Sequence, residues 1–199
     1  MATIGNLKTA IGLQVRDTGF AEISAANVLA LINQSARDAG NAGWLIPISD
    51  DTSLTYAAIT FAYEVPASFL HIKDIFDVNG LLAQRHYWDL RTQGGDPTIV
   101  FNDAAPLRLA AGALTIVGYK RPKEDYTADG DTVEAGIETF LTFRAASYAL
   151  TYMVAGVSEL DQVRQQQAEL RMRDSEIALQ RRIEIEERLV PTLRAVPGR

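Results

Sequence analysis

The sequence contains no cysteine and only two histidines among its 199 residues. The absence of cysteine excludes disulfide bonds, thiolate nucleophiles and cysteine-ligated metals. No run of apolar residues approaches the ~20 that a membrane-spanning helix needs. At the N-terminus no basic segment precedes an apolar one, so a secretory signal is not expected. These absences predict a protein that is soluble and stays in the compartment in which it is made.

Positive charge is also scarce, because 19 lysines and arginines stand against 25 aspartates and glutamates, which gives a net charge of −6. This balance argues against general nucleic-acid binding, which depends on clustered Lys and Arg at the phosphates. One basic cluster occurs, and it consists of Arg171, Arg173, Arg181 and Arg182. Acidic residues lie three or four positions away on the same segment. Pairing along a helix is therefore favoured over contact with phosphates, which stays the alternative.

The common catalytic signatures are missing. The sequence has no G-x-S-x-G nucleophile elbow, no G-x-x-x-x-G-K-[ST] phosphate loop, no G-x-G-x-x-G and no H-E-x-x-H. His71 and His86 fall on adjoining predicted strands, and His71 with Asp74 or Asp77 is one conceivable metal site. The favoured interpretation places both histidines on the solvated side of a sheet. We therefore predict no catalytic residue, no metal or cofactor site and no enzymatic activity.

The first forty residues have the periodicity of two amphipathic helices. Thr3 can cap the first helix. Its apolar side consists of Ile4, Leu7, Ile11 and Val15. Ser24 can cap the second, and Gly40 is predicted to end it. The apolar positions of the second helix are Ala25, Val28, Leu29, Ile32 and Ala36. Residues 1–43 are thus predicted to form a helical hairpin, whose apolar faces need a partner.

From Trp44 the apolar period changes to two, which is typical of strands. The first predicted strand carries Ile59, Phe61, Tyr63 and Val65 on one face and ends at Pro66. The second carries Leu70, Ile72, Phe76 and Val78 on one face. Asn79-Gly80 predicts a hairpin turn into a third strand from Leu81 to Trp88. With short strands at 99–101 and 114–120, residues 44–124 are predicted to form a small antiparallel module.

The aromatic residues of this region admit two interpretations. They could form a ligand-binding set, and the residues concerned are Trp44, Tyr56, Phe61, Tyr63 and Trp88. Aromatic residues at strand spacing more commonly pack into the core of a sheet. Core packing is therefore the favoured interpretation.

Two helices are predicted in the last third of the chain. Asp131 can cap the first, with Glu134 three residues on, and residues 133–154 are apolar on most sides, as expected of a buried helix. The second, over residues 158–189, begins at the potential cap Ser158. Its sparse apolar residues Val163, Leu170 and Ile177 recur every seven positions. At ~1.5 Å per residue this helix spans roughly 45–50 Å, more than its own domain needs, so a second chain is expected to cover it.

Together these patterns predict an α+β fold that is mainly α. A helical bundle, formed by the N-terminal hairpin and two C-terminal helices of which the last is long, carries an inserted antiparallel β module. The expected parts are residues 1–43 for the hairpin, 44–124 for the β module, 125–190 for the long helices, and 191–199 for an extended arm.

Three short stretches, taken in order, resemble one protein family. Ile32–Arg37 matches a second helix with an Asn-x-x-Ala-Arg run, and Tyr63–Phe69 matches a strand end with a Tyr-x-x-Pro-x-x-Phe arrangement. Trp88–Leu90 matches a Trp-x-x region after a hairpin. With the long C-terminal helix, these stretches resemble the head–tail adaptor, or connector, proteins of tailed bacteriophages. The resemblance extends from Ile4 to about Leu179.

The resemblance implies a structural protein of the virion. Members form a ring, typically of twelve copies, that docks under the portal protein at one capsid vertex and joins the capsid to the tail. Their helical bundles pack side by side around a channel for the viral DNA, and the β part faces outward or toward the next tail or neck protein. DNA passes without sequence-specific binding, which suits a negatively charged subunit. Synthesis in the cytoplasm of the bacterial host is implied.

The C-terminal segment is the surface that the resemblance implies for the portal. The residues assigned to it are Arg181, Arg182, Ile183, Ile185, Leu189, Val190, Leu193 and Val196. Its apolar members form no helical stripe for the chain's own core, so a partner is expected to bury and order them. Two alternatives stay open: another neck or tail-completion protein with the same helical core, and a small enzyme with an unrecognised site.

Overall fold

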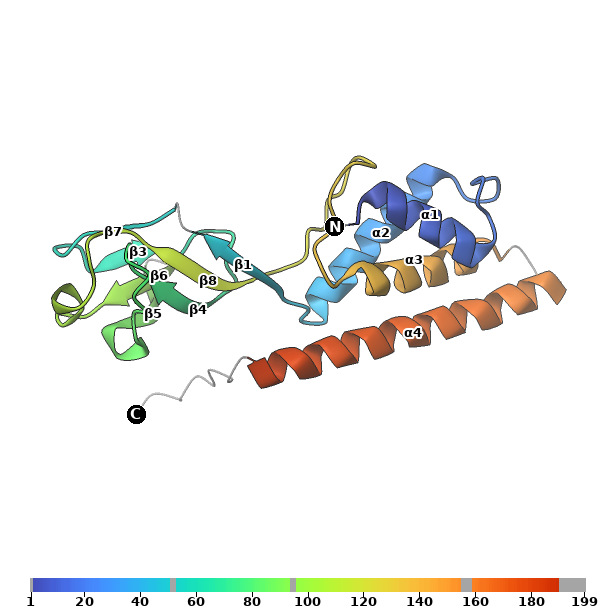
Figure 1. Cartoon of the computed structure of the whole chain (residues 1–199). Coiled ribbons are helices and arrows are strands. Elements are labelled where there is room, and N and C mark those ends of the chain that lie inside the picture. The colour runs from blue at the N-terminus through green and yellow to red at the C-terminus, as the bar shows by residue number, and fades with distance from the viewer. Residues whose placement is uncertain (1, 51–52, 94–95, 155–158, 190–199) are drawn as a thin grey trace. The chain divides into compact units, whose positions relative to one another are not determined.

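A computed structural model describes residues 2–50, 53–93, 96–154 and 159–189, without the side chains of residues 93 and 183–189. The chain divides into two compact units (Figure 1). The helical unit comprises residues 1–45 and 121–199, and the β unit comprises residues 46–120. The segments before and after the β unit thus belong to the same helical unit.

The balance of helix and strand corrects the expected fold class. Helices account for 43% of the residues and strands for about 22%, and the strands lie in three antiparallel sheets. The fold is therefore α+β, and the prediction of a mainly α protein was wrong. The reason lies in the β unit, which has its own core rather than being a small appendage of the bundle.

Four helices are described, α1 (Ile4–Val15), α2 (Ala25–Asn41), α3 (Glu138–Tyr152) and α4 (Glu159–Leu189). Both predicted N-caps of the hairpin are confirmed: Thr3 Oγ1 accepts the N–H of Asn6, and Ser24 Oγ accepts the N–H of Asn27. α3 packs against α1, α2 and α4. The predicted apolar faces are buried at Ile4, Leu7, Ile11, Val15, Val28, Ile32 and Ala36.

Two predicted helix boundaries were wrong. α2 continues through Gly40, which is buried inside it, and the glycine with a left-handed backbone is Gly43, at φ +89°. Asp131 does not cap α3, because its carboxylate accepts the N–H groups of Thr127 and Ala128 in a turn. Gly136, at φ +92°, then redirects the chain, and α3 begins only at Glu138.

The described residues of the β unit form two three-stranded sheets and one two-stranded pair. One sheet has the order β1 (Ile46–Asp50), β8 (Thr115–Lys120), β4 (His71–Phe76). The other has the order β3 (Ala62–Glu64), β6 (Asp96–Phe101), β5 (Trp88–Gln93). β2 (Thr55–Tyr56) pairs with β7 (Gly112–Ala113). Residues from all three contribute to one apolar core, including Tyr56, Ile75, Ile99 and Ile116.

Several strand predictions in this unit were wrong in extent or phase. Ile59 lies outside any strand and is 89% exposed, and Leu70 and Val78 are also exposed. A register shift in β4 between Ile72 and Asp74 turns Ile72 and Ile75 to the core, which strict alternation does not allow. The expected strand from Leu81 to Trp88 is replaced by a single bridge and the 3₁₀ helix η1 (Arg85–Tyr87).

The aromatic residues mostly serve the cores. In the β unit, Tyr56 lies 5.0 Å from Phe101 between ring centres, and Trp88 is buried with its Nε1–H donating to the Ala83 carbonyl. In the helical unit, Trp44 packs on Phe140 at 5.4 Å. Of the set considered as a ligand site, only Phe61 is exposed. Core packing, the favoured interpretation, is thus confirmed for the rest.

Replacing Ile32 tests the hairpin core. Ile32 is fully buried on α2. We expect Ile32→Ala to lower the free energy of unfolding by about 2–5 kcal/mol, because the truncation leaves a cavity. Denaturant unfolding followed by helical circular dichroism measures this, with Leu13→Ala, at a 63% exposed apolar position of α1, as the control. A loss below about 0.5 kcal/mol for Ile32→Ala contradicts the assignment of this core.

Candidate functional site

Small and polar residues form the inward face of α4. Asp161, Ala168 and Ser175, spaced by seven, are 6%, 6% and 0% exposed, and we call them the inner seam. Ser147 of α3 donates its hydroxyl to the Ala168 carbonyl at 2.8 Å, so the two helices lie close together. Among the described side chains of α4, Ala168 is the only buried apolar one. α4 therefore adds little to the apolar core of its own unit.

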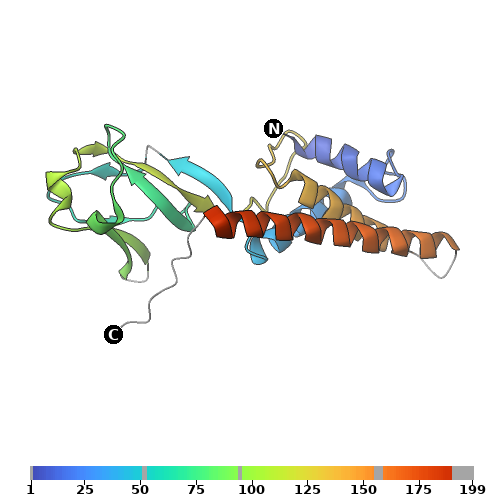
Figure 2. The same cartoon turned by 60° about the horizontal axis from the view of Figure 1, so that its bottom comes forward.

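Polar contacts hold α4 in place along its length. Arg164 forms an ion pair with Glu22 and donates a hydrogen bond to the Met153 carbonyl at 3.0 Å. Toward the other end, Arg182 donates to the Leu45 carbonyl at 3.3 Å. Figures 1 and 2 show α4 running beside α3 at the edge of the helical unit. Its opposite side is therefore the one available to other molecules.

Apolar residues occupy that opposite side. Val163, Leu170 and Ile177 are 46%, 58% and 38% exposed, and we call them the outer stripe. Each follows an inner-seam residue by two positions, which places it ~200° around the helix. The seven-residue repeat seen in the sequence is therefore real but faces away from the unit's own core. Such an apolar row, on a helix that is already packed on its other side, is a candidate surface for contact with another protein.

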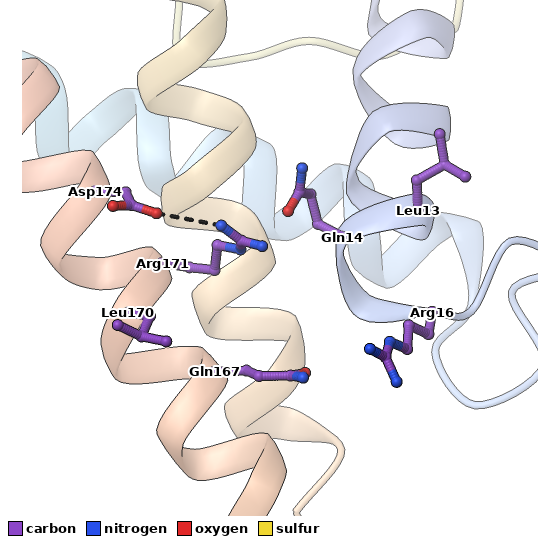
Figure 3. Close-up of a pocket in the computed structure, with 7 residues that line it drawn as sticks. All are labelled: Leu13, Gln14, Arg16, Gln167, Leu170, Arg171 and Asp174. Atoms are coloured by element: carbon purple, nitrogen blue, oxygen red, sulfur yellow. Dashed lines mark hydrogen bonds and ion pairs between the residues drawn. The ribbon is translucent and has the colours of Figure 1, made fainter.

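A groove beside the outer stripe adds a second exposed leucine. Leu13 on α1 is 63% exposed and lines this groove together with Leu170 of α4. The groove has a volume of about 410 Å³, and its other lining residues are Gln14, Arg16, Gln167, Arg171 and Asp174 (Figure 3). Arg171 and Asp174 form an ion pair at 3.2 Å. The lining is amphipathic and carries no nucleophile beside a base, so it suits protein contact better than catalysis.

The basic residues of α4 fit the helix-pairing interpretation in part. Arg171 pairs with Asp174 and also lies over the Phe143 ring, with its guanidinium carbon 5.6 Å from the ring centre. Arg173 and Arg181 are exposed. A phosphate site needs several converging cations. Two of these four arginines contact groups of their own unit instead. Arg171 contacts Asp174 and the Phe143 ring, and Arg182 donates to the Leu45 carbonyl.

Some of the predicted portal residues lie in the part of the chain that the structure describes, and the others lie outside it. Arg181 and Arg182 lie on α4. Ile183, Ile185 and Leu189 lie on the same helix, but their side chains are outside the description. Val190, Leu193 and Val196 lie outside the described residues altogether, as does the proposed cap Ser158. Portal contact by this segment therefore stays a prediction.

The histidine–aspartate pairs singled out in the sequence do not form a metal site in the described part of the chain. No group of three or more His, Asp or Glu side chains there is close enough to hold a metal ion. His71 is exposed on β4, and His86 lies in η1 with its ring 3.8 Å from that of Tyr87. Asp77 is buried and has a structural role instead.

Asp77 organises the turn after β4. Its carboxylate accepts the N–H groups of Asn79, Leu81 and Ala110 at 2.8–3.0 Å. Burial raises the pKa of this carboxyl, but the three donors outweigh burial and leave the pKa below its ordinary value of about 3.8. The turn itself confirms the Asn79-Gly80 prediction, with Gly80 at φ +75°.

Asp17 does the same in the helical unit, and the sequence interpretation missed it. Its carboxylate accepts the N–H groups of Ala21, Glu22 and Ile23. Burial raises its pKa, but the three donors outweigh burial and leave the pKa below its ordinary value. The loop between α1 and α2 is thereby fixed next to the end of α1 that carries Leu13. An aspartate just after a helix and before a short polar loop is the signal that could have indicated this role.

Three stretches carried the family resemblance, and each contains a residue with a structural role. Asn33 accepts the Tyr126 N–H and donates to the Tyr126 carbonyl, both at 3.0 Å, which ties α2 to the chain before α3. Phe69 and Trp88 are buried in the β unit. These roles are structural, and they identify no ligand.

Two comparisons with known proteins give no relative. No family model matches the chain, and no curated protein matches it. Among the described residues, no helix is long and apolar enough to cross a bilayer. The head–tail adaptor resemblance therefore rests on the stretches quoted above.

Replacing Asp77 should change the free energy of unfolding by an amount that depends on pH. Because the folded pKa of Asp77 lies below the unfolded one, its stabilisation is complete above the unfolded pKa and disappears as the pH falls through the folded pKa. We expect Asp77→Asn to lower the free energy of unfolding at pH 7 by about 1–3 kcal/mol, since buried donors lose their charged acceptor. The difference from the wild type should shrink below about pH 3.8.

Denaturant unfolding at a series of pH values, followed by tryptophan fluorescence, measures this difference. Asp103→Asn is the matched control, because Asp103 is an exposed aspartate of the same unit and should show little change in stability. An equal loss for Asp77→Asn at pH 3 and pH 7 contradicts the charged role.

Proposed function

We propose that this protein is a structural head–tail adaptor of a tailed bacteriophage. In this role, copies of the chain form a ring, typically of twelve, between the portal protein and the next tail or neck protein. The ring continues the channel through which the viral DNA passes. The chain acts as a structural part of the virion and catalyses no reaction. The sequence resemblance supplies the family, and the outward face of α4 supports the kind of function.

The outer stripe is the observation that carries the proposal. A 31-residue helix contributes one buried alanine to its own core among its described side chains, yet it presents three half-exposed apolar residues outward. The hydrophobic effect favours covering such a row, at about 25 cal/mol per Å² of apolar surface. In a protein that functions alone the outer stripe would stay exposed to water, whereas in a subunit of an assembly a neighbouring molecule can bury it.

The absence of a clear chemical centre in the described residues is compatible with a structural role. The pocket lined by Leu13 and Leu170 brings together one ion pair, Arg171 with Asp174, rather than an acid, a base and a nucleophile. The buried carboxylates of Asp17 and Asp77 are occupied by backbone N–H groups of their own loops. An enzyme with an unrecognised site stays the weaker alternative.

Another neck or tail-completion protein is the closer alternative, because it would use the same outward face. The two proposals differ in the partner. An adaptor binds the portal directly, whereas a completion protein binds a ring that is already in place. The neighbouring genes distinguish the two: a portal gene upstream and tail genes downstream would favour the adaptor.

Deleting the gene from its phage tests the proposal. We expect filled heads and free tails to accumulate without joining, because the part between them is missing. Adding the purified full-length protein to the extract should restore joined, infectious particles, as seen by electron microscopy and plaque counts. Leu170→Glu should fail in this assay with an unchanged melting midpoint, since a charge on the outer stripe opposes its burial.

The control for Leu170→Glu is Gln162→Glu, which adds the same charge to an exposed position of α4 outside the outer stripe. It should restore joining like the wild type. Normal virions from the deletion strain contradict the adaptor role. Full activity of Leu170→Glu contradicts the use of the outer stripe.

The predicted portal surface is tested by a shortened chain. We expect a protein that ends at Leu189 to keep its melting midpoint, because the contact of Arg182 with the Leu45 carbonyl is retained. Binding to heads that carry the portal should be lost, since Val190, Leu193 and Val196 are missing. Co-sedimentation with purified heads measures this binding. Retained binding removes these three residues from the portal surface.

A further inference from the structure

The residues on the outward face of α4 are arranged symmetrically about Leu170. Val163 lies seven residues before Leu170, and Ile177 lies seven residues after it. Glu159 lies eleven residues before it, and Arg181 lies eleven after it. All five are exposed. At ~100° per residue they fall within one side of the helix. The face therefore reads apolar at its centre, acidic at one end and basic at the other.

We propose that two copies of the free protein pair through this face, with the two α4 helices antiparallel and Leu170 on the two-fold axis. In that arrangement Val163 of each copy meets Ile177 of the other. Glu159 of each copy lies opposite Arg181 of the other, so the end charges attract. Closed two-fold pairing of this kind needs only one self-complementary patch.

Charge selects the antiparallel arrangement over the parallel one. A parallel pair in register places Glu159 against Glu159 and Arg181 against Arg181. Like charges that face each other across a helix pair repel. The middle of the face agrees, because antiparallel pairing brings the Gln166 amide to the Asp174 carboxylate. Antiparallel helices also place opposite ends of their macrodipoles together.

The interface of this dimer is small, so the dimer should be weak. One heptad position is apolar here, whereas stable coiled coils use two. An interface of three apolar residues from each helix belongs to the small, transient class. The dimer therefore covers the outer stripe in the free protein and separates when a larger surface competes for it. This inference concerns the free protein and does not depend on the adaptor role.

Single cysteines test the pairing cleanly, because the natural chain has none. Leu170→Cys should form an intermolecular disulfide under mild oxidation, since a residue on the axis brings two Cβ atoms within the ~4 Å that a disulfide needs. Val163→Cys and Ile177→Cys should each stay mainly monomeric alone. A mixture of these two variants should form the crossed disulfide, in at least about tenfold higher yield than either alone.

Gln162→Cys is the matched control, because it is an exposed position on α4 outside the symmetric face. It should give only the background of random collision. A homodisulfide of Val163→Cys as abundant as the crossed product indicates parallel pairing and overturns the proposal. Equal yields for Leu170→Cys and Gln162→Cys show that free copies do not pair through this face, and they overturn it as well.

Charge exchange provides an independent readout on the full-length protein. Sedimentation equilibrium should show Glu159→Arg and Arg181→Glu each weakening the dimer about two- to fivefold, as expected for exposed ion pairs. The double variant, Glu159→Arg with Arg181→Glu, should restore wild-type affinity, because the opposed charges attract again. A double variant weaker than either single one contradicts the opposition of these two residues.

Discussion

The close approach of α4 to α3 is the constraint on which the rest of the helical unit depends. Asp161, Ala168 and Ser175 are small enough to let the two backbones approach, and the Ser147 hydroxyl bonds directly to the Ala168 carbonyl. A helix held this way needs no large apolar side chain on its inward face. Its larger apolar residues are therefore free to face outward, where Leu170 lines a groove together with Leu13 of α1.

The sequence predicts the helical unit well because its helices follow simple local rules. Thr3 and Ser24 cap helices as expected, and the i, i+3, i+4, i+7 spacing places Ile32 in the core. These local rules do not predict which way Val163, Leu170 and Ile177 face. An apolar repeat shows that a surface is to be covered, but not whether its own unit or another molecule covers it. The inner seam repeats at the same interval, and small residues at that spacing were the available signal.

The β unit and the loops were predicted less well, for physical reasons that are non-local. The register shift at Ile72 depends on pairing with β8, over forty residues away, so alternation in the sequence gives the wrong face for Phe76. Asp131 has the spacing of a helix cap, yet two nearby N–H groups in a turn compete for its carboxylate. The nearness of Asp77 to His71 in the sequence makes it a conceivable metal ligand, yet backbone N–H groups of Asn79, Leu81 and Ala110 occupy its carboxylate.

The central claim is that another protein molecule covers the outer stripe of α4 in the assembled particle. Hydroxyl-radical footprinting of the wild-type protein tests it most directly, by comparing oxidation of residues 163–177 in the dilute free subunit and in joined particles. The account predicts strong protection of Leu170 and Ile177 on assembly, with little change at Leu107, which is 82% exposed on the β unit. Equal oxidation of Leu170 in both states would contradict it.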